Sequence, residues 1–381
     1  MNSIVSLGKD FYLTLVKKSC QKVKNKHQKI IFLLSFPSTS HYLLQKIYEK
    51  FEDRLIICYT NDGQILAENY QKKGCTIYAL DHLPTLFKKV IPMVKGSRVI
   101  LCDNYYAFLA GMSFDNETSV VQVWHANGAI KLFGLNAHYT KDASMRDHLR
   151  YSAVYQKFTH YMISSAKMET IFAANYQQPV TGLRFGYAPT DYYFDEEWLC
   201  NVRRKFAENF SENKKVVLYV PTYREKTLNI PLTFSKMAST LGEEWLILVK
   251  AHPHDHELQT QLDPTVITDF KGLTLQEILP SVDCLITDYS SVPFEYSLAN
   301  PEGKIIFFCY DLFDYQKTVG IEADFIEWAP GKIVQNEYEL IQEIKNPMKK
   351  SLHNFNQIWN EYAQGNAAEQ LIEWVERKYE D

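Results

Sequence analysis

The alternation of short apolar runs with helix-like stretches is the feature that most limits how this chain can fold. In the first half the apolar runs are Lys29–Phe36, Arg54–Thr60, Cys75–Leu80, Arg98–Asp103, Val120–Trp124 and Tyr161–Ser164. The second series comprises Val216–Val220, Trp245–Val249, Cys284–Thr287 and Lys304–Phe308. Short apolar runs that alternate with helices are typical of parallel strands covered on both faces of a sheet.

The length of 381 residues suits two domains of ordinary size. We therefore predict an α/β fold with two Rossmann-like domains that face each other across a cleft. Gly and Pro cluster in Thr181–Asp191, which predicts a domain boundary there. We assign residues 29–190 to an N-terminal domain and 191–350 to a C-terminal domain. Because Asn354–Tyr379 is amphipathic, we expect residues 351–381 to form one long helix that crosses back to the first domain.

The N-terminal segment, residues 1–28, is basic and amphipathic. The lysines up to the first strand are Lys9, Lys17, Lys18, Lys22, Lys24, Lys26 and Lys29, against the single acidic residue Asp10. Leu7, Phe11 and Leu15 follow helical spacing. Such a segment can lie in the interface of an anionic membrane, where each lysine contributes about 1 kcal/mol. The alternative is a helix packed on its own protein with solvated lysines. No apolar run approaches the about 18 residues of a membrane span.

Composition and the absence of common motifs exclude several classes of protein. The net charge of −4, with no sustained basic excess, argues against nucleic-acid binding. The seven cysteines show no CxxC spacing and interrupt apolar runs, as small hydrophobic residues do, which favours a reducing cytosol. GxGxxG, GxxxxGK[ST] and GxSxG loops are absent, which disfavours dinucleotide dehydrogenases, P-loop ATPases and α/β-hydrolases. We expect no cofactor.

One apolar run leads directly into a predicted helix in the stretch LITDYSSVPFEY. The run ends at Thr287 and Asp288, and Ser290 and Ser291 follow, with Ser291 placed as an N-cap. Free N–H groups at the start of a helix, together with serine hydroxyls, make an anion site. Glu295 lies in the first turn. The alternative is an ordinary capped turn between a strand and a helix.

Two histidines occupy similar positions at predicted strand ends. His125, in VWHANG, could take a proton from a hydroxyl as a general base, or could be held by a hydrogen bond that orients its loop. His252, in KAHPH, could stabilise charge on a departing phosphoryl group. Its neighbours His254, Asp255 and His256 lack the spacing of zinc ligands, so we expect no metal site.

Two basic residues also follow strand ends. Arg224, in VPTYRE, and Lys250 could each hold a phosphate, or could instead form salt bridges on the rim of the site.

Four motifs occur in a fixed order: VWHANGAIKLFGL, VLYVPTYRE, KAHPH and LITDYSSVPFEYSLANPEGKIIFFCYDLFDY. In this order they resemble the CDP-glycerol glycerophosphotransferases of teichoic acid synthesis. The resemblance extends from about Lys29 to the last helix. It is greatest to the glycerol-phosphate primases, because the chain is short and its histidine motif reads WHANG.

The resemblance implies a glycosyltransferase-B fold, associated peripherally with the cytoplasmic face of the cell membrane. It implies that His125 activates the acceptor hydroxyl and that His252 contacts the donor phosphates. The residues expected to bind the donor, CDP-glycerol, are Thr222, Arg224, Thr287, Asp288, Ser290, Ser291 and Glu295. Asp103, Asn104 and Asn127 are expected on the acceptor side.

The reaction implied is transfer of glycerol phosphate from CDP-glycerol to the 4-hydroxyl of ManNAc, with release of CMP. The acceptor is the ManNAc-GlcNAc disaccharide linked to undecaprenyl diphosphate. Three alternatives remain open: a glycerol- or ribitol-phosphate polymerase of the same family, a glycosyltransferase-B enzyme that uses a nucleotide sugar, and a non-catalytic scaffold at the membrane. An anionic membrane surface and other teichoic acid enzymes are candidate partners.

Overall fold

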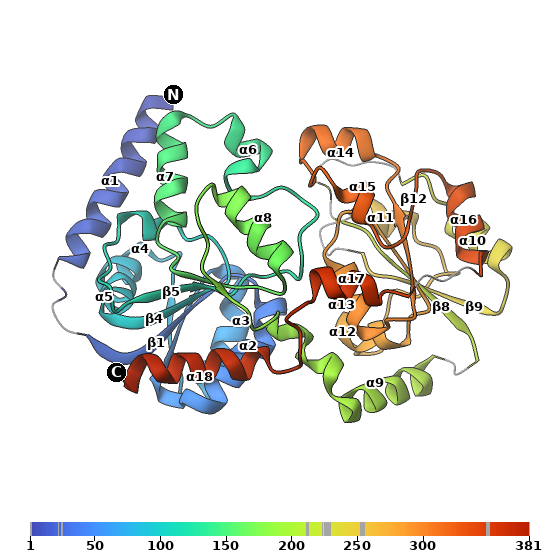
Figure 1. Ribbon diagram of the computed structural model, residues 1–381, viewed down its shortest axis with the longest axis horizontal. Coiled ribbons are helices and arrows are strands. Elements are labelled where there is room, and N and C mark those ends of the chain that lie inside the picture. Colours follow the sequence, from blue (N-terminus) through green and yellow to red (C-terminus); the bar gives the residue numbers. More distant parts are fainter. Residues whose placement is uncertain are drawn as a thin grey trace. The chain divides into compact units, whose positions relative to one another are not determined.

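The structure is a computed structural model that describes residues 2–21, 23, 26–210, 213–222, 224, 230–251, 256–347 and 351–380. Two compact units make up the chain (Figure 1). Unit 1 comprises Met1–Ala126, Phe133–Asp191 and Tyr362–Asp381, and unit 2 comprises Asn127–Leu132 and Tyr192–Glu361. Each unit has its own parallel sheet, so the prediction of an α/β fold with two parallel-sheet domains is confirmed.

The sheet of unit 1 has seven parallel strands in the order β3-β2-β1-β4-β5-β6-β7. They are β1 His27–Leu34, β2 Leu55–Tyr59, β3 Thr76–Ala79, β4 Ser97–Cys102, β5 Ser119–Gln122, β6 His160–Met162 and β7 Gly182–Leu183. The last five residues of β1 are all buried, as expected for a strand covered on both faces.

Nine α-helices belong to the described part of unit 1. They are α1 Asn2–Cys20, α2 Pro37–Phe51, α3 Gln64–Lys72, α4 Leu83–Thr85, α5 Ile91–Gly96, α6 His138–Lys141, α7 Met145–Tyr155, α8 Ala166–Tyr176 and α18 Ala367–Glu380. The core between strands and helices contains Phe32 and Leu101 from the sheet, Leu44 from α2, and Leu371 and Val375 from α18. The last helix of the chain therefore completes the core of the first unit.

The sheet of unit 2 has five parallel strands in the order β12-β11-β10-β8-β9. They are β8 Lys215–Val220, β9 Trp245–Val249, β10 Cys284–Thr287, β11 Lys304–Phe308 and β12 Lys332–Val334. The helices are α9 Glu196–Asn209, α10 Phe234–Leu241, α11 His256–Gln261, α12 Leu275–Ile278, α13 Val292–Ala299, α14 Leu312–Thr318, α15 Phe325–Trp328, α16 Glu337–Lys345 and α17 His353–Trp359.

The C-terminal region differs from the single long helix predicted, so that prediction is wrong. Residues of this region form two helices, α17 in unit 2 and α18 in unit 1. Gly365 lies between them with φ of +79°, a conformation that continues no helix. The new helix is capped by Asp191, whose carboxylate accepts hydrogen bonds from the backbone N–H groups of Ala367 and Ala368, each at 3.0 Å.

Helix α1 packs on unit 1 through one of its faces. Val16 and Cys20 are buried, and Arg150 of α7 forms an ion pair with Asp10 at 2.7 Å. Lys9 pairs with Asp147, also of α7, at 2.7 Å. Figure 1 shows α1 and α7 side by side. The packing agrees with the alternative of a helix held on its own protein, but it accounts for only one face of α1.

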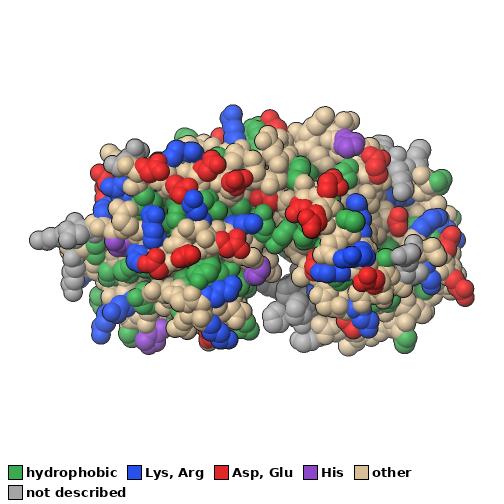
Figure 2. Space-filling view, turned by 90° about the horizontal axis from the view of Figure 1, so that it is seen from below, with side chains coloured by type: hydrophobic (Ala, Val, Ile, Leu, Met, Phe, Trp, Pro, Cys, Tyr) green, Lys and Arg blue, Asp and Glu red, His purple; other side chains and the backbone are tan. Residues whose placement is uncertain are grey.

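The cysteines behave as the sequence predicts. All seven are free, and every one except Cys200 is buried. On the face drawn in Figure 2, acidic and basic side chains are interspersed without a broad patch of one sign. Among the described helices, none has the length and apolar character that a membrane crossing requires.

Candidate functional site

The order of strands identifies one edge of each sheet as the place for a site. In unit 1 the order reverses between β1 and β4, and in unit 2 between β8 and β10. Ligands of open α/β sheets bind beyond the carboxyl ends of the strands at such a reversal. Most of the candidate residues predicted from the sequence follow β4, β8 or β10, so the fold brings them to these edges.

His125 lies on the edge of unit 1 in a defined orientation. Its Nδ1 is 2.7 Å from the backbone carbonyl oxygen of Asp103. A carbonyl oxygen only accepts, so Nδ1 carries a proton in this contact. The imidazole stacks on the ring of Phe36, with centroids 3.9 Å apart and planes inclined by 12°. The hydrogen bond and the stacking together fix the orientation of the ring.

Trp124, next to His125, has a strained backbone. Its φ is +65°, which is uncommon for a residue with a large side chain. Its backbone N–H donates to the side-chain oxygen of Gln122 at 3.0 Å. Its ring packs against Phe133 and Phe172, with centroids 4.8 and 5.0 Å away. These contacts hold the turn that presents His125. The sequence analysis did not identify Trp124 or Phe36 as part of the site.

Asp103 is buried and stabilises this edge of the sheet of unit 1 through hydrogen bonds. Its carboxylate accepts hydrogen bonds from the N–H groups of Ser35 and Phe36, both at 2.8 Å, from Ser40 Oγ at 3.0 Å and from Tyr106 Oη at 2.7 Å. Burial raises the pKa of Asp103, while these hydrogen bonds oppose the rise. The residue is completely buried, so its carboxylate positions the turn after β1.

The other two residues expected on the acceptor side lie in different units. Asn104 belongs to unit 1, and its side-chain oxygen accepts from Tyr105 N at 2.7 Å. Asn127 belongs to unit 2, where it is buried and its Nδ2 donates to Asn360 Oδ1 at 2.8 Å. Asn127 therefore belongs to a different unit from Asp103 and Asn104.

The edge of unit 2 is organised by Asp288. Its Oδ1 accepts from the N–H groups of Thr222 at 2.8 Å and Tyr289 at 2.6 Å. The hydroxyl of Thr287 donates to Val220 O at 2.8 Å. These bonds join the ends of β8 and β10, and Thr287 and Asp288 are completely buried. The sequence analysis expected Thr287 and Asp288 to bind the donor. In the structure their side chains hydrogen-bond to the backbone of unit 2.

Arg224 is held among carboxylates and tyrosines. Its Nε and one Nη bind Asp311 in a bidentate manner at 2.6 and 3.0 Å, and the same Nη lies 2.9 Å from Asp288 Oδ2. The rings of Tyr289, Tyr310 and Tyr315 lie 5.0–5.7 Å from the guanidinium. Burial disfavours the charge, but Asp311 and Asp288 outweigh it and raise the pKa of Arg224.

Asp311 is thus a site residue that the sequence analysis missed. It follows β11, and the only local sign was that this apolar run also ends in polar residues.

The serines precede α13. Ser290 Oγ accepts from Val292 N at 3.2 Å, whereas Ser291 occupies the N-cap position without a side-chain cap. The prediction that Ser291 is the N-cap residue is confirmed, but the capping hydrogen bond in the first turn is accepted by Ser290 instead of by Ser291. Glu295 is buried in α13, and desolvation raises its pKa to about 7.

His252 lies outside the described residues, so the structure assigns it no position. Lys250 is exposed, and its ammonium lies 5.4 Å from the centroid of the Phe270 ring. Within the described part of the chain, no three His, Cys, Asp or Glu side chains are grouped so that they could hold a metal ion.

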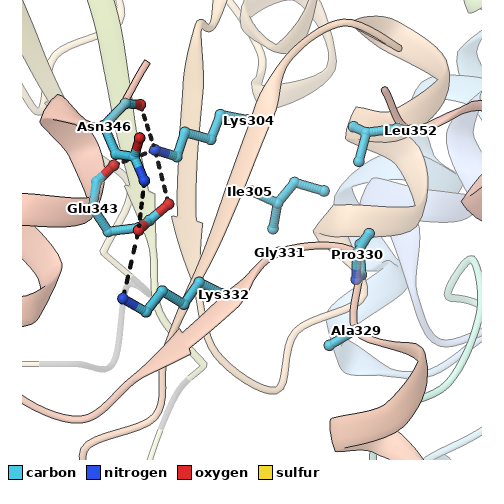
Figure 3. A pocket seen from close by; sticks show the side chains of 9 residues that line it. All are labelled: Lys304, Ile305, Ala329, Pro330, Gly331, Lys332, Glu343, Asn346 and Leu352. Carbon is cyan, nitrogen blue, oxygen red and sulfur yellow. Dashed lines mark hydrogen bonds and ion pairs between the residues drawn. The ribbon is translucent and has the colours of Figure 1, made fainter. Parts of the chain in front are cut away.

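A cavity of about 410 Å³ lies at the opposite, amino-terminal edge of the sheet of unit 2 (Figure 3). Lys304 begins β11, and its ammonium contacts Glu343 Oε1 and Asn346 O, both at 3.0 Å. Lys332 begins β12 and lies 3.7 Å from Glu343. These polar groups of the cavity wall bind one another. We therefore assign them a role in stabilising the fold and do not treat the cavity as a binding site.

Comparison with known proteins identifies the family. The model of the CDP-glycerol:poly(glycerophosphate) glycerophosphotransferase family matches residues 18–377. A teichoic acid glycerol-phosphate primase of Bacillus subtilis (strain 168) is 29% identical over 375 residues, which cover 96% of each chain. Another, of Bacillus spizizenii (strain ATCC 23059 / NRRL B-14472 / W23), is 30% identical over 359 residues and 92% of each chain.

Solved structures agree on the fold. The wall teichoic acid polymerase TagF aligns with a TM-score of 0.73 at 18% identity, over 100% of this chain and 96% of that one. A UDP-GlcNAc 2-epimerase from Neisseria meningitidis aligns with a TM-score of 0.56 at 12% identity, over 92% of this chain and 100% of that one. The fold is thus that of glycosyltransferase-B-like enzymes with two parallel-sheet domains.

The chain belongs to the CDP-glycerol:poly(glycerophosphate) glycerophosphotransferase family, and it is a transferase.

Proposed function

We propose that this protein is a teichoic acid glycerol-phosphate primase. It transfers glycerol phosphate from CDP-glycerol to the 4-hydroxyl of ManNAc in undecaprenyl-diphosphate-linked ManNAc-GlcNAc. The observation that carries the proposal is the orientation of His125, whose Nδ1 donates to Asp103 O at 2.7 Å, as expected of an imidazole that takes a proton at Nε2. The two glycerol-phosphate primases that are 29% and 30% identical over nearly the whole chain support a primase, and the matching family model supports CDP-glycerol as the donor.

The proposed mechanism is direct in-line phosphoryl transfer. Nε2 of His125 takes the proton of the acceptor hydroxyl, and the hydroxyl oxygen forms a bond to the β-phosphorus of CDP-glycerol. The bond from that phosphorus to the bridging oxygen breaks, and CMP leaves with this oxygen. Catalysis of this kind depends chiefly on positioning and on stabilising the charge that develops.

The donor is proposed to bind at the edge of unit 2 where β8 and β10 end. The amino terminus of α13, with Ser290 and Ser291 before it, offers hydrogen-bond donors to phosphate oxygens. Thr222 lies at the same edge, because its N–H binds Asp288. His252 is proposed to contact the same phosphates on the basis of the family resemblance alone.

We also propose a peripheral position on the cytoplasmic face of the cell membrane. Val5, Leu7 and Phe11 of α1 are 57%, 61% and 63% exposed, and Met145 and Leu149 of the neighbouring α7 are 75% and 64% exposed. Leu7 and Phe11 are four residues apart, as are Met145 and Leu149, so each pair shares one helix face. Apolar faces on two adjacent helices fit the interfacial region of a lipid bilayer.

The direct test supplies the full chain with CDP-glycerol and a lipid-linked ManNAc-GlcNAc acceptor. We expect CMP release that requires both substrates, and a product heavier by one glycerol phosphate in mass spectrometry. A ladder of products would indicate a polymerase. Turnover of CDP-ribitol or of a UDP-sugar in place of CDP-glycerol would assign a different donor. Binding of CDP-glycerol without turnover of any of these donors would favour a scaffold.

A further inference from the structure

The edge of unit 2 where β8 and β10 end, here called the donor edge, carries an excess of negative charge. Arg224 is shared between the carboxylates of Asp288 and Asp311, at 2.9 and 2.6 Å, so these three side chains together carry one negative charge. A diphosphate brought to this edge would be repelled by that excess. Arg224 alone therefore cannot supply the positive charge that a nucleotide diphosphate needs.

The segment 127–132 lies between two parts of unit 1 in the sequence but belongs to unit 2. Lys131 forms an antiparallel bridge with Ile321. On either side of it, Glu322 N donates to Ile130 O at 2.8 Å and Leu132 N donates to Gly320 O at 3.1 Å. The backbone at Lys131 is therefore held in unit 2 by hydrogen bonds on both sides.

Gly128 fixes the beginning of the same segment. Its φ is +68°, and a Cβ atom at this position would come within 2.5 Å of the ring of Phe294 in α13. Only glycine allows this close approach to the helix that begins at the donor edge. The segment thus runs past the first turn of α13.

The electrostatic surroundings of Lys131 include two members of the charged cluster. The residue remains exposed, but desolvation around its ammonium and the nearby Arg224 lower its pKa, and the charge of Asp288 opposes this decrease. The charges of Asp288 and Arg224 therefore both act on Lys131, a second basic residue of unit 2 whose backbone is held near this edge.

A second observation indicates that a ligand binds here. The hydroxyl of Thr222 is buried and has no hydrogen-bond partner among the described residues. Leaving a buried hydroxyl unpaired costs about 1–3 kcal/mol. A phosphate oxygen beside Asp288 would accept this hydrogen bond.

We propose that Lys131 binds the diphosphate of the donor at the edge of unit 2, together with the hydroxyl of Thr222. This inference rests on the proposed function, because it takes the donor to be a nucleotide diphosphate. It gives the WHANGAIK segment two tasks: His125 acts on the acceptor, and Lys131, six residues later, binds the donor.

Calorimetric titration of the full chain with CDP-glycerol, CMP and cytidine tests the proposal. Loss of one charged contact to phosphate is worth about 10- to 100-fold in affinity. We expect Lys131→Gln to weaken CDP-glycerol binding by this factor, CMP binding less, and cytidine binding not at all. Lys131→Arg should retain most of the affinity. The control is Lys332→Gln, which removes the same charge at the opposite edge of the sheet and should leave all three affinities unchanged.

Unchanged affinity of Lys131→Gln for CDP-glycerol would overturn the assignment. An equal loss for cytidine would also overturn it, because the defect would then be structural rather than a missing phosphate contact. If the wild-type protein bound no CDP-glycerol, the proposed function would fail, and this inference would fail with it.

Discussion

The carbonyl oxygen of Asp103 lies 2.7 Å from Nδ1 of His125, and the carboxylate of the same residue holds the turn that carries Phe36. Phe36 in turn stacks on the imidazole at 3.9 Å. One buried residue therefore sets both the tautomer of His125 and the aromatic surface against which it rests. Such a doubly fixed imidazole loses little entropy when it receives a proton.

Substitution of His125 tests the proposed general base. General bases contribute about 10²- to 10⁴-fold to rates, so His125→Ala should lower kcat by this factor in the CMP-release assay. Its circular dichroism and thermal unfolding should match those of the wild-type protein. His353→Ala is the control, since this histidine is exposed in α17 and its Nε2 lies 3.3 Å from the carboxylate of Glu302. Full activity of a folded His125→Ala protein would exclude the proposed role.

Asp311 should matter for stability through Arg224. Asp311 accepts two charge-assisted hydrogen bonds from Arg224, and a hydrogen bond to a charged group contributes about 1.5–3 kcal/mol. We expect Asp311→Asn to lower the free energy of unfolding in urea by an amount at the low end of this range, because Asp288 remains beside Arg224. Asp314→Asn, on the exposed side of α14, should change it by less than about 1 kcal/mol. Equal effects of the two variants would contradict the bridging role of Asp311.

Glu295 should make stability depend on pH. Its folded pKa of about 7 lies above the ordinary value of 4.5, so the folded state binds the proton more tightly than the unfolded state. Its favourable contribution is complete below pH 4.5 and is lost as the pH rises to about 7. Glu295→Gln should therefore be more stable than the wild-type protein at pH 8 by roughly 3 kcal/mol, and similar to it at pH 4.5. Urea unfolding at both pH values measures this difference, and the same difference at each pH would refute it.

The exposed faces of α1 and α7 should determine membrane binding. We expect the double variant Phe11→Ser/Leu149→Ser to float less with anionic vesicles than the wild-type protein, because it removes one large apolar side chain from each helix. Ile65→Ser, which alters a 78% exposed residue of α3, is the control. Activity on a water-soluble acceptor should be the same for all three proteins. Undiminished flotation of the double variant would place the membrane contact elsewhere.

Much of the fold could be predicted from local patterns. Short apolar runs that end in polar residues predicted the strands, their parallel arrangement, the edge of one sheet at which His125 lies and the edge of the other at which Thr222 and Asp288 lie. These features depend on the period of hydrophobic residues and on the chemistry of strand ends, which are written in contiguous residues. The same patterns did not predict the break between α17 and α18. Asp191, which caps α18, comes from a distant part of the chain.

Three features of the site were decided by tertiary structure alone. Asp103 braces the turn after β1 because the order of strands makes β4 the neighbour of β1. Asp311 binds Arg224 across 87 residues of sequence, and the segment 127–132 joins unit 2 although both its flanks belong to unit 1. Amino-acid sequence by itself determined which residues could act as base, cation or helix cap. Packing of helices on the sheets decided which of them met, because side-chain contacts between distant segments leave no periodic signal in the sequence.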